Sequence, residues 1–277
     1  DDSAGIVREW SGRDQRVRLV HAAAPSDRLG AARSFAWLLD HLPSDATHVM
    51  FADQDDVWLP RKIERTLAAM GEAETALGAS MPILVHTDLV VADEALAQLH
   101  ASFWTYSHIR PEPVTLRRIV SHNVTTGATV MMNRALTTLA GPMPPEMAMH
   151  DWWCACVAAA FGRIIALREA TVLYRQHGAN AVGARDKRLS FASLPKAILA
   201  RRGTTAEFRR GLSETAAQAR CFLSRYGAAL DDADRRFLDA YARIPQRGLL
   251  RRKVDLLRFR VLPDHGMLHA LGVLIRG

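Results

Sequence analysis

The chain has 277 residues, of which 49% are hydrophobic and 23% are charged. This is the composition of an ordinary globular protein that can bury a sizeable core. Its three cysteines, Cys154, Cys156 and Cys221, are odd in number and lack zinc-site spacing. They argue against a disulfide framework and favour a reducing, cytoplasmic setting. No apolar run reaches transmembrane length and no signal peptide is visible, so we expect no membrane-spanning segment.

The formal net charge of +7 is unevenly distributed. Residues 1–184 contain 16 Lys and Arg against 20 Asp and Glu, a balance of −4, whereas residues 185–277 contain 20 against 9, a balance of +11. We therefore expect a catalytic domain over residues 1–184 and a basic, mostly helical extension over residues 185–277. The arginines of the extension alternate with aliphatic residues, which favours contact with an anionic membrane surface over nucleic acid. A packed helix with a solvated basic face is the alternative.

An acidic turn follows a short apolar run at residues 48–52, which we interpret as a buried strand. Asp53, Asp55 and Asp56 lie within four positions. Carboxylates this close repel one another unless a cation lies among them, and Asp53 and Asp55 can face the same ion. Hard oxygen ligands suit Mg²⁺ or Mn²⁺, usually with a phosphate completing the shell. The alternative is a solvated turn, which Asp residues favour for local backbone reasons.

Apolar periodicity and the positions of Gly and Pro predict the remaining elements. A helix is expected to continue through residues 6–10, followed by a strand at 16–20 and a helix from Ser26 that ends at Pro43. The further predicted elements are a helix from Pro60 to about residue 70, a loop at 71–81, a strand at 82–88, a helix at 115–121, a turn and strand at 123–133, a helix from His150 that ends at Gly162, strands at 164–167 and 171–174, and helices at 189–200, 205–226 and 232–244. Strands that alternate with helices predict an α/β fold.

Two acids among these elements have more than one interpretation. Asp88 ends a predicted strand, where an acid at the edge of a site and a turn residue are both consistent with the pattern. Asp151 lies at the start of an apolar helix, where a carboxylate can cap exposed backbone N–H groups. The following Trp152 and Trp153 limit the access of water to Asp151.

The block from Asp53 to Trp58, with Pro60 and Lys62, resembles the DQDDVW-x-P-x-K signature of family 2 glycosyltransferases, in the branch with many rhamnosyltransferase-like members. The resemblance covers about residues 1–184 in four or five blocks in the expected order. The other blocks are Asp1-Asp2 near the start, a strand that ends in Thr87-Asp88, an N-x-x-x-G-x-x-x-x-x-N pattern from Asn123 to Asn133, His150-Asp151-Trp152-Trp153, and Tyr174-Arg175-Gln176-His177. The family's first strand and first helix are absent from this chain.

The resemblance implies a GT-A fold, which is a Rossmann-like mixed sheet flanked by helices, here with a C-terminal helical extension. It also implies metal-dependent, inverting transfer of a sugar, with L-rhamnose the leading candidate, from a dTDP- or UDP-linked donor. Asp151 corresponds to the general base, and Asp53, Asp55 and His177 to the ligands of Mg²⁺ or Mn²⁺. The residues expected to contact donor or acceptor are Asp2, Asp53, Trp58, Asp88, Asn123, Gly127, His150, Trp152 and Arg175.

A glycan or lipid-linked acceptor at the inner face of the cell membrane, used in cell-surface polysaccharide synthesis, fits the basic extension. Two alternatives use the same residues differently. A metal-dependent phosphohydrolase or nucleotidyltransferase needs the same carboxylates but releases phosphate or pyrophosphate. An inactive fragment that binds anionic partners through residues 185–277 is indifferent to Asp55 and strongly salt-dependent.

Overall fold

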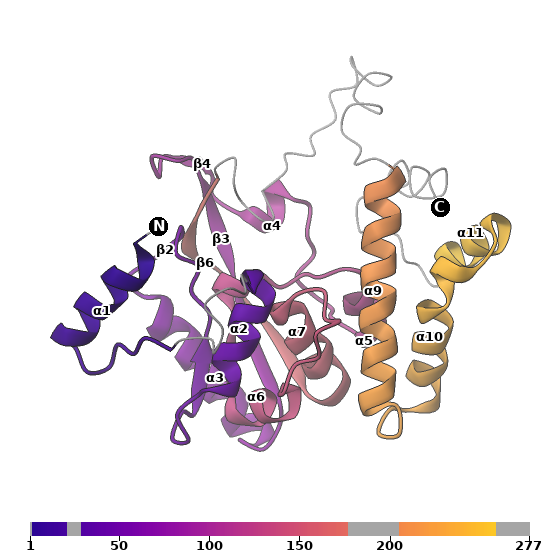
Figure 1. Ribbon diagram of the computed structural model, residues 1–277, viewed down its shortest axis with the longest axis horizontal. Helices are drawn as coiled ribbons and strands as arrows, with labels where there is room; N and C mark the ends of the chain where they lie inside the picture. The colour runs from indigo at the N-terminus through magenta and orange to yellow at the C-terminus, as the bar shows by residue number, and fades with distance from the viewer. Residues whose placement is uncertain (1, 21–28, 177–204, 259–277) are drawn as a thin grey trace, which may run out of the picture.

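The computed structural model describes residues 2–20, 29–176 and 205–258 (Figure 1). A mixed sheet with the strand order β1-β5-β3-β6-β2 forms its centre, and β4 pairs with β3 outside this path. The strands are β1 (His48–Met50), β2 (Val57–Trp58), β3 (Ile83–Ala92), β4 (Gln98–His100), β5 (Met131–Asn133) and β6 (Arg163–Arg175). The expected α/β class is confirmed, while the more specific GT-A assignment stays a prediction.

The directions of the strands decide which loops meet. Strands β3 and β6 are parallel over their whole length, from the pair Ile83 and Arg163 to the pair Ala92 and Arg175. Strand β5 is antiparallel to both β1 and β3, so β1, β3 and β6 run the same way. Their carboxyl ends therefore lie at one edge of the sheet, which is where open α/β sheets bind ligands.

Alternating side chains place a core on each face of the sheet. Leu84 and Met132 pack into a large cluster with helix α7 (His150–Phe161), whereas Ile83, Val85 and Met131 pack into a smaller cluster with helix α3 (Lys62–Leu77). This is the two-residue period of a strand that is buried on both sides. Helix α7 is apolar around most of its circumference because it is covered on all sides, as expected for a core helix.

The other described helices surround these layers. They are α1 (Ser3–Arg13), α2 (Gly30–Asp40), α4 (Phe103–Tyr106), α5 (Leu116–Ser121), α6 (Arg134–Ala140), α9 (Thr205–Tyr226), α10 (Asp232–Ala242) and α11 (Leu249–Arg258), with short 3₁₀ turns η1 (Gly127–Thr129) and η3 (Ile244–Gln246). Figure 1 shows α1 on one side of the molecule and α9, α10 and α11 together on the opposite side.

Helices α9 and α10 extend the core that surrounds α7. The ring of Trp153 lies 5.5 Å from that of Phe222 and 6.0 Å from that of Tyr226, measured between centroids. A buried hydrogen bond of 2.8 Å joins the hydroxyls of Thr215 and Tyr241 and ties α9 to α10. Helix α9 thus packs directly on the sheet-covering helix α7, and α10 is joined to it through α9. No described helix has the length and apolar character needed to cross a membrane.

Two predicted elements are wrong. Residues 16–20 form no strand, because they pair with none of the described strands and an isolated strand leaves its backbone groups without ladder partners. The loop expected at 71–81 is the second half of α3, which continues to Leu77 and ends at Gly78 with a φ of +91°. Good helix formers such as Glu72, Ala73 and Glu74 outweigh the cost of Gly71.

The strands expected at 164–167 and 171–174 are one strand, β6, whose register with β3 shifts on both sides of Asp88. Among the helices, the prediction for 205–226 matches α9 at both ends, and that for 232–244 matches α10 to within two residues. The helix predicted at 189–200 lies outside the described residues.

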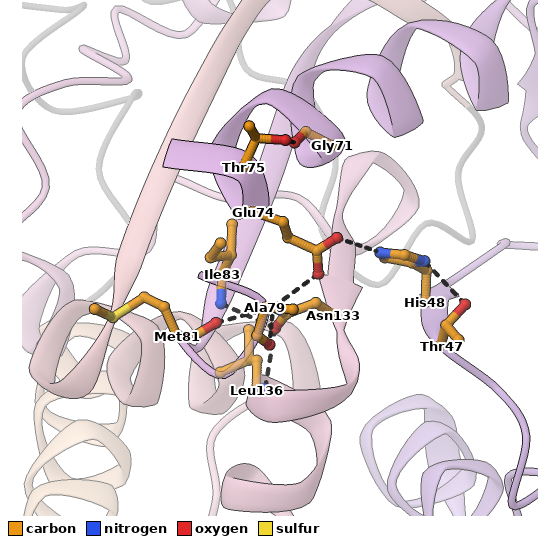
Figure 2. Close-up of polar contacts among 10 residues, drawn as sticks. All are labelled: Thr47, His48, Gly71, Glu74, Thr75, Ala79, Met81, Ile83, Asn133 and Leu136. Carbon is orange, nitrogen blue, oxygen red and sulfur yellow. Dashed lines mark hydrogen bonds and ion pairs between the residues drawn. The ribbon is translucent and has the colours of Figure 1, made fainter. Parts of the chain in front are cut away.

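A polar network lies at the other end of the strands, beside the amino ends of β1 and β3 (Figure 2). The side-chain oxygen of Asn133 accepts from the backbone N–H groups of Ile83 and Leu136, at 3.0 and 3.1 Å. Its amide donates to the carbonyl of Met81 at 2.9 Å and to Glu74 at 3.2 Å. Asn133 therefore caps α6 and joins three elements, at the end of β5 remote from Asn123 and Gly127.

Candidate functional site

The acidic turn follows β1 at the edge of the sheet where the carboxyl ends of β1, β3 and β6 meet. Burial, assisted by the negative charge of Asp55, raises the pKa of Asp53. Burial also raises the pKa of Asp56 to about 6, with further contributions from Asp53 and Asp55. Oδ2 of Asp56 is buried and has no hydrogen-bond partner within the described residues. The turn thus holds negative charge that its surroundings compensate only in part.

Arg175, at the end of β6, fixes the shape of this turn. Its backbone N–H donates to Oδ1 of Asp56 at 3.0 Å, and its guanidinium donates to the carbonyls of Asp55 at 2.8 Å and Glu94 at 2.6 Å. These contacts show that Arg175 positions the acidic turn, in addition to the contact with donor or acceptor that the resemblance implies.

Asp151 lies in the first turn of α7 and is only 5% exposed. Burial raises the pKa of its carboxyl group to about 6, against the opposing effect of hydrogen bonds from the backbone of Trp152 and the side chain of Asn123. The two bonds measure 2.8 and 3.1 Å. The charge of Asp53 acts on both Asp151 and Asp56, so the acidic turn and the start of α7 form one electrostatic site.

Asn123 is itself held in a single orientation. Its side-chain oxygen accepts from the backbone N–H of Thr125 at 3.0 Å and from the Thr125 hydroxyl at 2.7 Å. This leaves the amide N–H₂ directed at Asp151, where a donor stabilises the ionised carboxylate. Asn123 and Asp151, 28 positions apart, are brought together as the sequence predicts.

Gly127 packs against the residue that precedes the acid. A Cβ atom at Gly127 would lie 3.1 Å from Nε2 of His150 and 3.7 Å from Cβ of Asp151. His150 cannot move aside freely, because its ring stacks on Phe35 at 4.3 Å and meets Phe51 edge-on at 4.5 Å. An alanine here would therefore require the His150 ring to shift by a few tenths of an ångström, whereas its contact with Asp151 would be an ordinary one. Burial lowers the pKa of His150 to about 4, which keeps the ring neutral.

Two further predicted contact residues have their polar groups engaged within the protein. The indole N–H of Trp152 donates to the carbonyl of Ile119 and so attaches α7 to α5. Asp88 is 7% exposed, and its carboxylate accepts from the Ser102 hydroxyl at 2.5 Å and the Trp104 backbone N–H at 3.1 Å. Asp88 thereby fixes the start of α4.

The remaining predicted residues differ in how closely the structure locates them. Trp58 is half-buried in β2, immediately after the acidic turn, and Asp2 is exposed at the N-cap of α1. His177, the third expected metal ligand, lies outside the described residues. Sequence reasoning assigned no role to Lys62, although its spacing from Thr66 and Met70 places it on the buried face of α3. This helical spacing is the sequence feature from which the burial of Lys62 could have been predicted.

The described residues contain no group of three His, Cys, Asp or Glu side chains arranged to hold a metal ion. The acidic turn nevertheless has the chemistry of a partial divalent site. Asp53 and Asp55 repel each other, and the buried Oδ2 of Asp56 has no hydrogen-bond partner in the described part of the chain. One or two carboxylates are the usual protein contribution to Mg²⁺ when phosphate oxygens and water supply the rest. Asp53 and Asp55 therefore fit a cation that is shared with a bound phosphate.

Comparison with known proteins adds no assignment. No family model matches the chain, and no curated protein matches it significantly.

Proposed function

We propose that the chain is an inverting glycosyltransferase that moves a sugar from a nucleotide-diphosphate donor to an acceptor hydroxyl. The observation that carries this proposal is the buried carboxylate of Asp151. Its pKa of about 6 suits a group that is ionised at neutral pH and still basic enough to accept a proton. The acidic turn, which suits a diphosphate with its cation, lies within electrostatic reach.

In the proposed reaction, Asp151 takes the proton of the acceptor hydroxyl as that oxygen attacks the anomeric carbon. A new carbon–oxygen bond forms on the face opposite the donor phosphate, and the bond to the phosphate oxygen breaks, releasing the nucleoside diphosphate. Asn123 holds the carboxylate in place, and Arg175 holds the turn that faces the diphosphate. A Mg²⁺ or Mn²⁺ ion at Asp53 and Asp55 would supply positive charge for the leaving diphosphate.

The first test is calorimetric binding of dTDP, UDP and GDP with Mn²⁺, with Mg²⁺ and with a chelator. We expect one nucleotide to bind in a metal-dependent way and the Asp55→Ala variant to lose that binding. The absence of binding to all three would contradict the proposal. Release of phosphate or pyrophosphate without an acceptor would favour a phosphohydrolase or nucleotidyltransferase instead.

The second test separates binding from chemistry. Asp151→Asn should bind the identified nucleotide normally but lose about 10²- to 10⁴-fold in transfer rate, the range supplied by a positioned base. Asp45→Asn, at an exposed position, is the matched control and should retain full activity. Full activity of Asp151→Asn would remove the proposed base.

A further inference from the structure

A buried lysine follows the acidic turn in the sequence, at the start of α3, and has no anionic partner among the described residues. Lys62 is 1% exposed, and its ammonium has no hydrogen-bond partner in the described part of the chain. Burial alone lowers the pKa of this group to about 8. The arrangement follows from sequence, because Lys62, Thr66 and Met70 share the face of α3 that packs on the sheet.

The surroundings of Lys62 supply a second unused donor. Its Nζ lies 5.0 Å from the centroid of the Trp58 ring, which gives a cation–π contact. The indole N–H of Trp58 is also buried and without a partner within the described residues. A cation–π contact offsets only part of the cost of removing an ammonium group from water. Two neighbouring donors therefore lack an acceptor.

Such a pair has the chemistry of an anion subsite, because buried donors are normally satisfied. The donors follow the acidic turn by two and six positions, counted from Asp56 to Trp58 and to Lys62. The missing acceptor is therefore expected to belong to a ligand that also reaches the turn. An oxygen of a diphosphate meets both conditions.

We propose that Lys62 and Trp58 form a subsite for a phosphate oxygen of the donor diphosphate, with Lys62 supplying positive charge and Trp58 a second hydrogen-bond donor. This inference rests on the proposed function, since it assigns the diphosphate of that donor. Lys62 acts in binding and does not take part in proton transfer.

The experiment compares calorimetric binding of UDP or dTDP with that of the corresponding nucleoside, for the intact chain and for Lys62→Met. The loss of a charge-assisted hydrogen bond should weaken diphosphate binding by about 10- to 100-fold and leave nucleoside binding unchanged. The variant should also melt at a higher temperature in the absence of ligand, because an uncompensated buried charge is gone. Arg61→Met removes the same charge from an adjacent, solvent-exposed position that pairs with Glu64, and should leave diphosphate affinity unchanged.

Unchanged diphosphate affinity in Lys62→Met would overturn the subsite while leaving the proposed function intact. An equal loss in Arg61→Met would also overturn it, because general electrostatics would then explain the effect.

If Lys62→Met does not fold, the Trp58→Phe variant is used for the test. It keeps an aromatic ring beside the ammonium group and removes the N–H donor. Selective loss of diphosphate affinity in that variant supports the subsite, and unchanged affinity contradicts it. Failure of the intact chain to bind any nucleoside diphosphate would reject the proposed function itself.

Discussion

The side-chain amide of Asn123 donates a 3.1 Å hydrogen bond to Oδ2 of Asp151, and Thr125 fixes the direction of that donor. The bond opposes the effect of burial, so the carboxyl group titrates near pH 6 rather than higher. A side chain in the loop after α5 thus opposes the larger effect of burial on the pKa of the proposed base, as does the backbone N–H of Trp152.

Asn123→Ala should shift the acid limb of the pH–rate profile toward higher pH. The amide stabilises the ionised form of Asp151, and its removal therefore raises the pKa of that carboxyl by roughly 1 unit, which corresponds to about 1.4 kcal/mol. Activity requires the ionised form and should appear only as the pH rises through the new value. The profile of kcat/KM against pH measures this. Thr125→Val should give a smaller shift in the same direction, and an unmoved limb in Asn123→Ala would assign it to another group.

Gly127→Ala should lower both stability and activity. The new methyl group meets Nε2 of His150 at 3.1 Å, and the His150 ring is held in place by Phe35 and Phe51. Overpacking of this kind lowers the free energy of unfolding by about 1–3 kcal/mol. Denaturant unfolding measures this loss. Gly71→Ala is the control, because nothing lies within 4 Å of that position on α3 and the helix should gain up to about 1 kcal/mol. Equal stability of the two variants would argue against close packing at Gly127.

Asn133→Ala should lower the free energy of unfolding by about 2–4 kcal/mol, because a helix cap is lost and buried N–H groups are left without an acceptor. The network in Figure 2 lies at the amino ends of β1 and β3, so the pH dependence of transfer should not change. Thr75→Ala removes an exposed hydroxyl of the same region and should alter stability by less than about 0.5 kcal/mol. A changed pH profile in Asn133→Ala would connect this edge to the chemistry.

Phe222→Ala should destabilise the whole chain by about 3–5 kcal/mol, the usual cost of truncating a buried aromatic side chain. Because Phe222 packs on Trp153 of α7, unfolding should remain a single transition by both circular dichroism and tryptophan fluorescence. Leu250→Ala is the control, since that side chain is 84% exposed. Two separate transitions in the intact chain would show that residues 205–258 unfold independently of the sheet.

The sequence predicted the features that depend on local chemistry. The helix that opens at His150 and the full extent of α9 follow from periodicity and from end signals. The apolar run before Asp53 forms a strand as expected, but β1 is a half-buried edge strand and not a buried one. The strand predicted at 16–20 failed because pairing depends on what lies beside a segment, which alternation alone does not reveal. The shift of register at Asp88 has the same origin, since it requires knowledge of the partner strand.

Several residues of the predicted site lie close together in the structure, while their predicted roles in binding and catalysis stay predictions. Asn123, Gly127 and Asp151 are brought together, yet His150 and Trp152 lie among protein partners, and Asn133 lies at the other edge of the sheet. A side chain that binds a ligand and one that completes a core can occupy the same motif. Only the neighbours in space distinguish them. Lys62 is the converse case, a buried residue whose ammonium has no hydrogen-bond partner among the residues that the structure describes.

The burial of the charged groups of Asp56, Lys62 and Asp151 has a consequence for selection experiments. Each pKa is displaced toward the neutral form, so each group lowers the stability of the folded chain at neutral pH. A library of variants screened only for resistance to heat should therefore become enriched in uncharged residues at these three positions. The same library screened for turnover should keep the original residues, and the difference between the two screens would map the trade-off between robustness and activity.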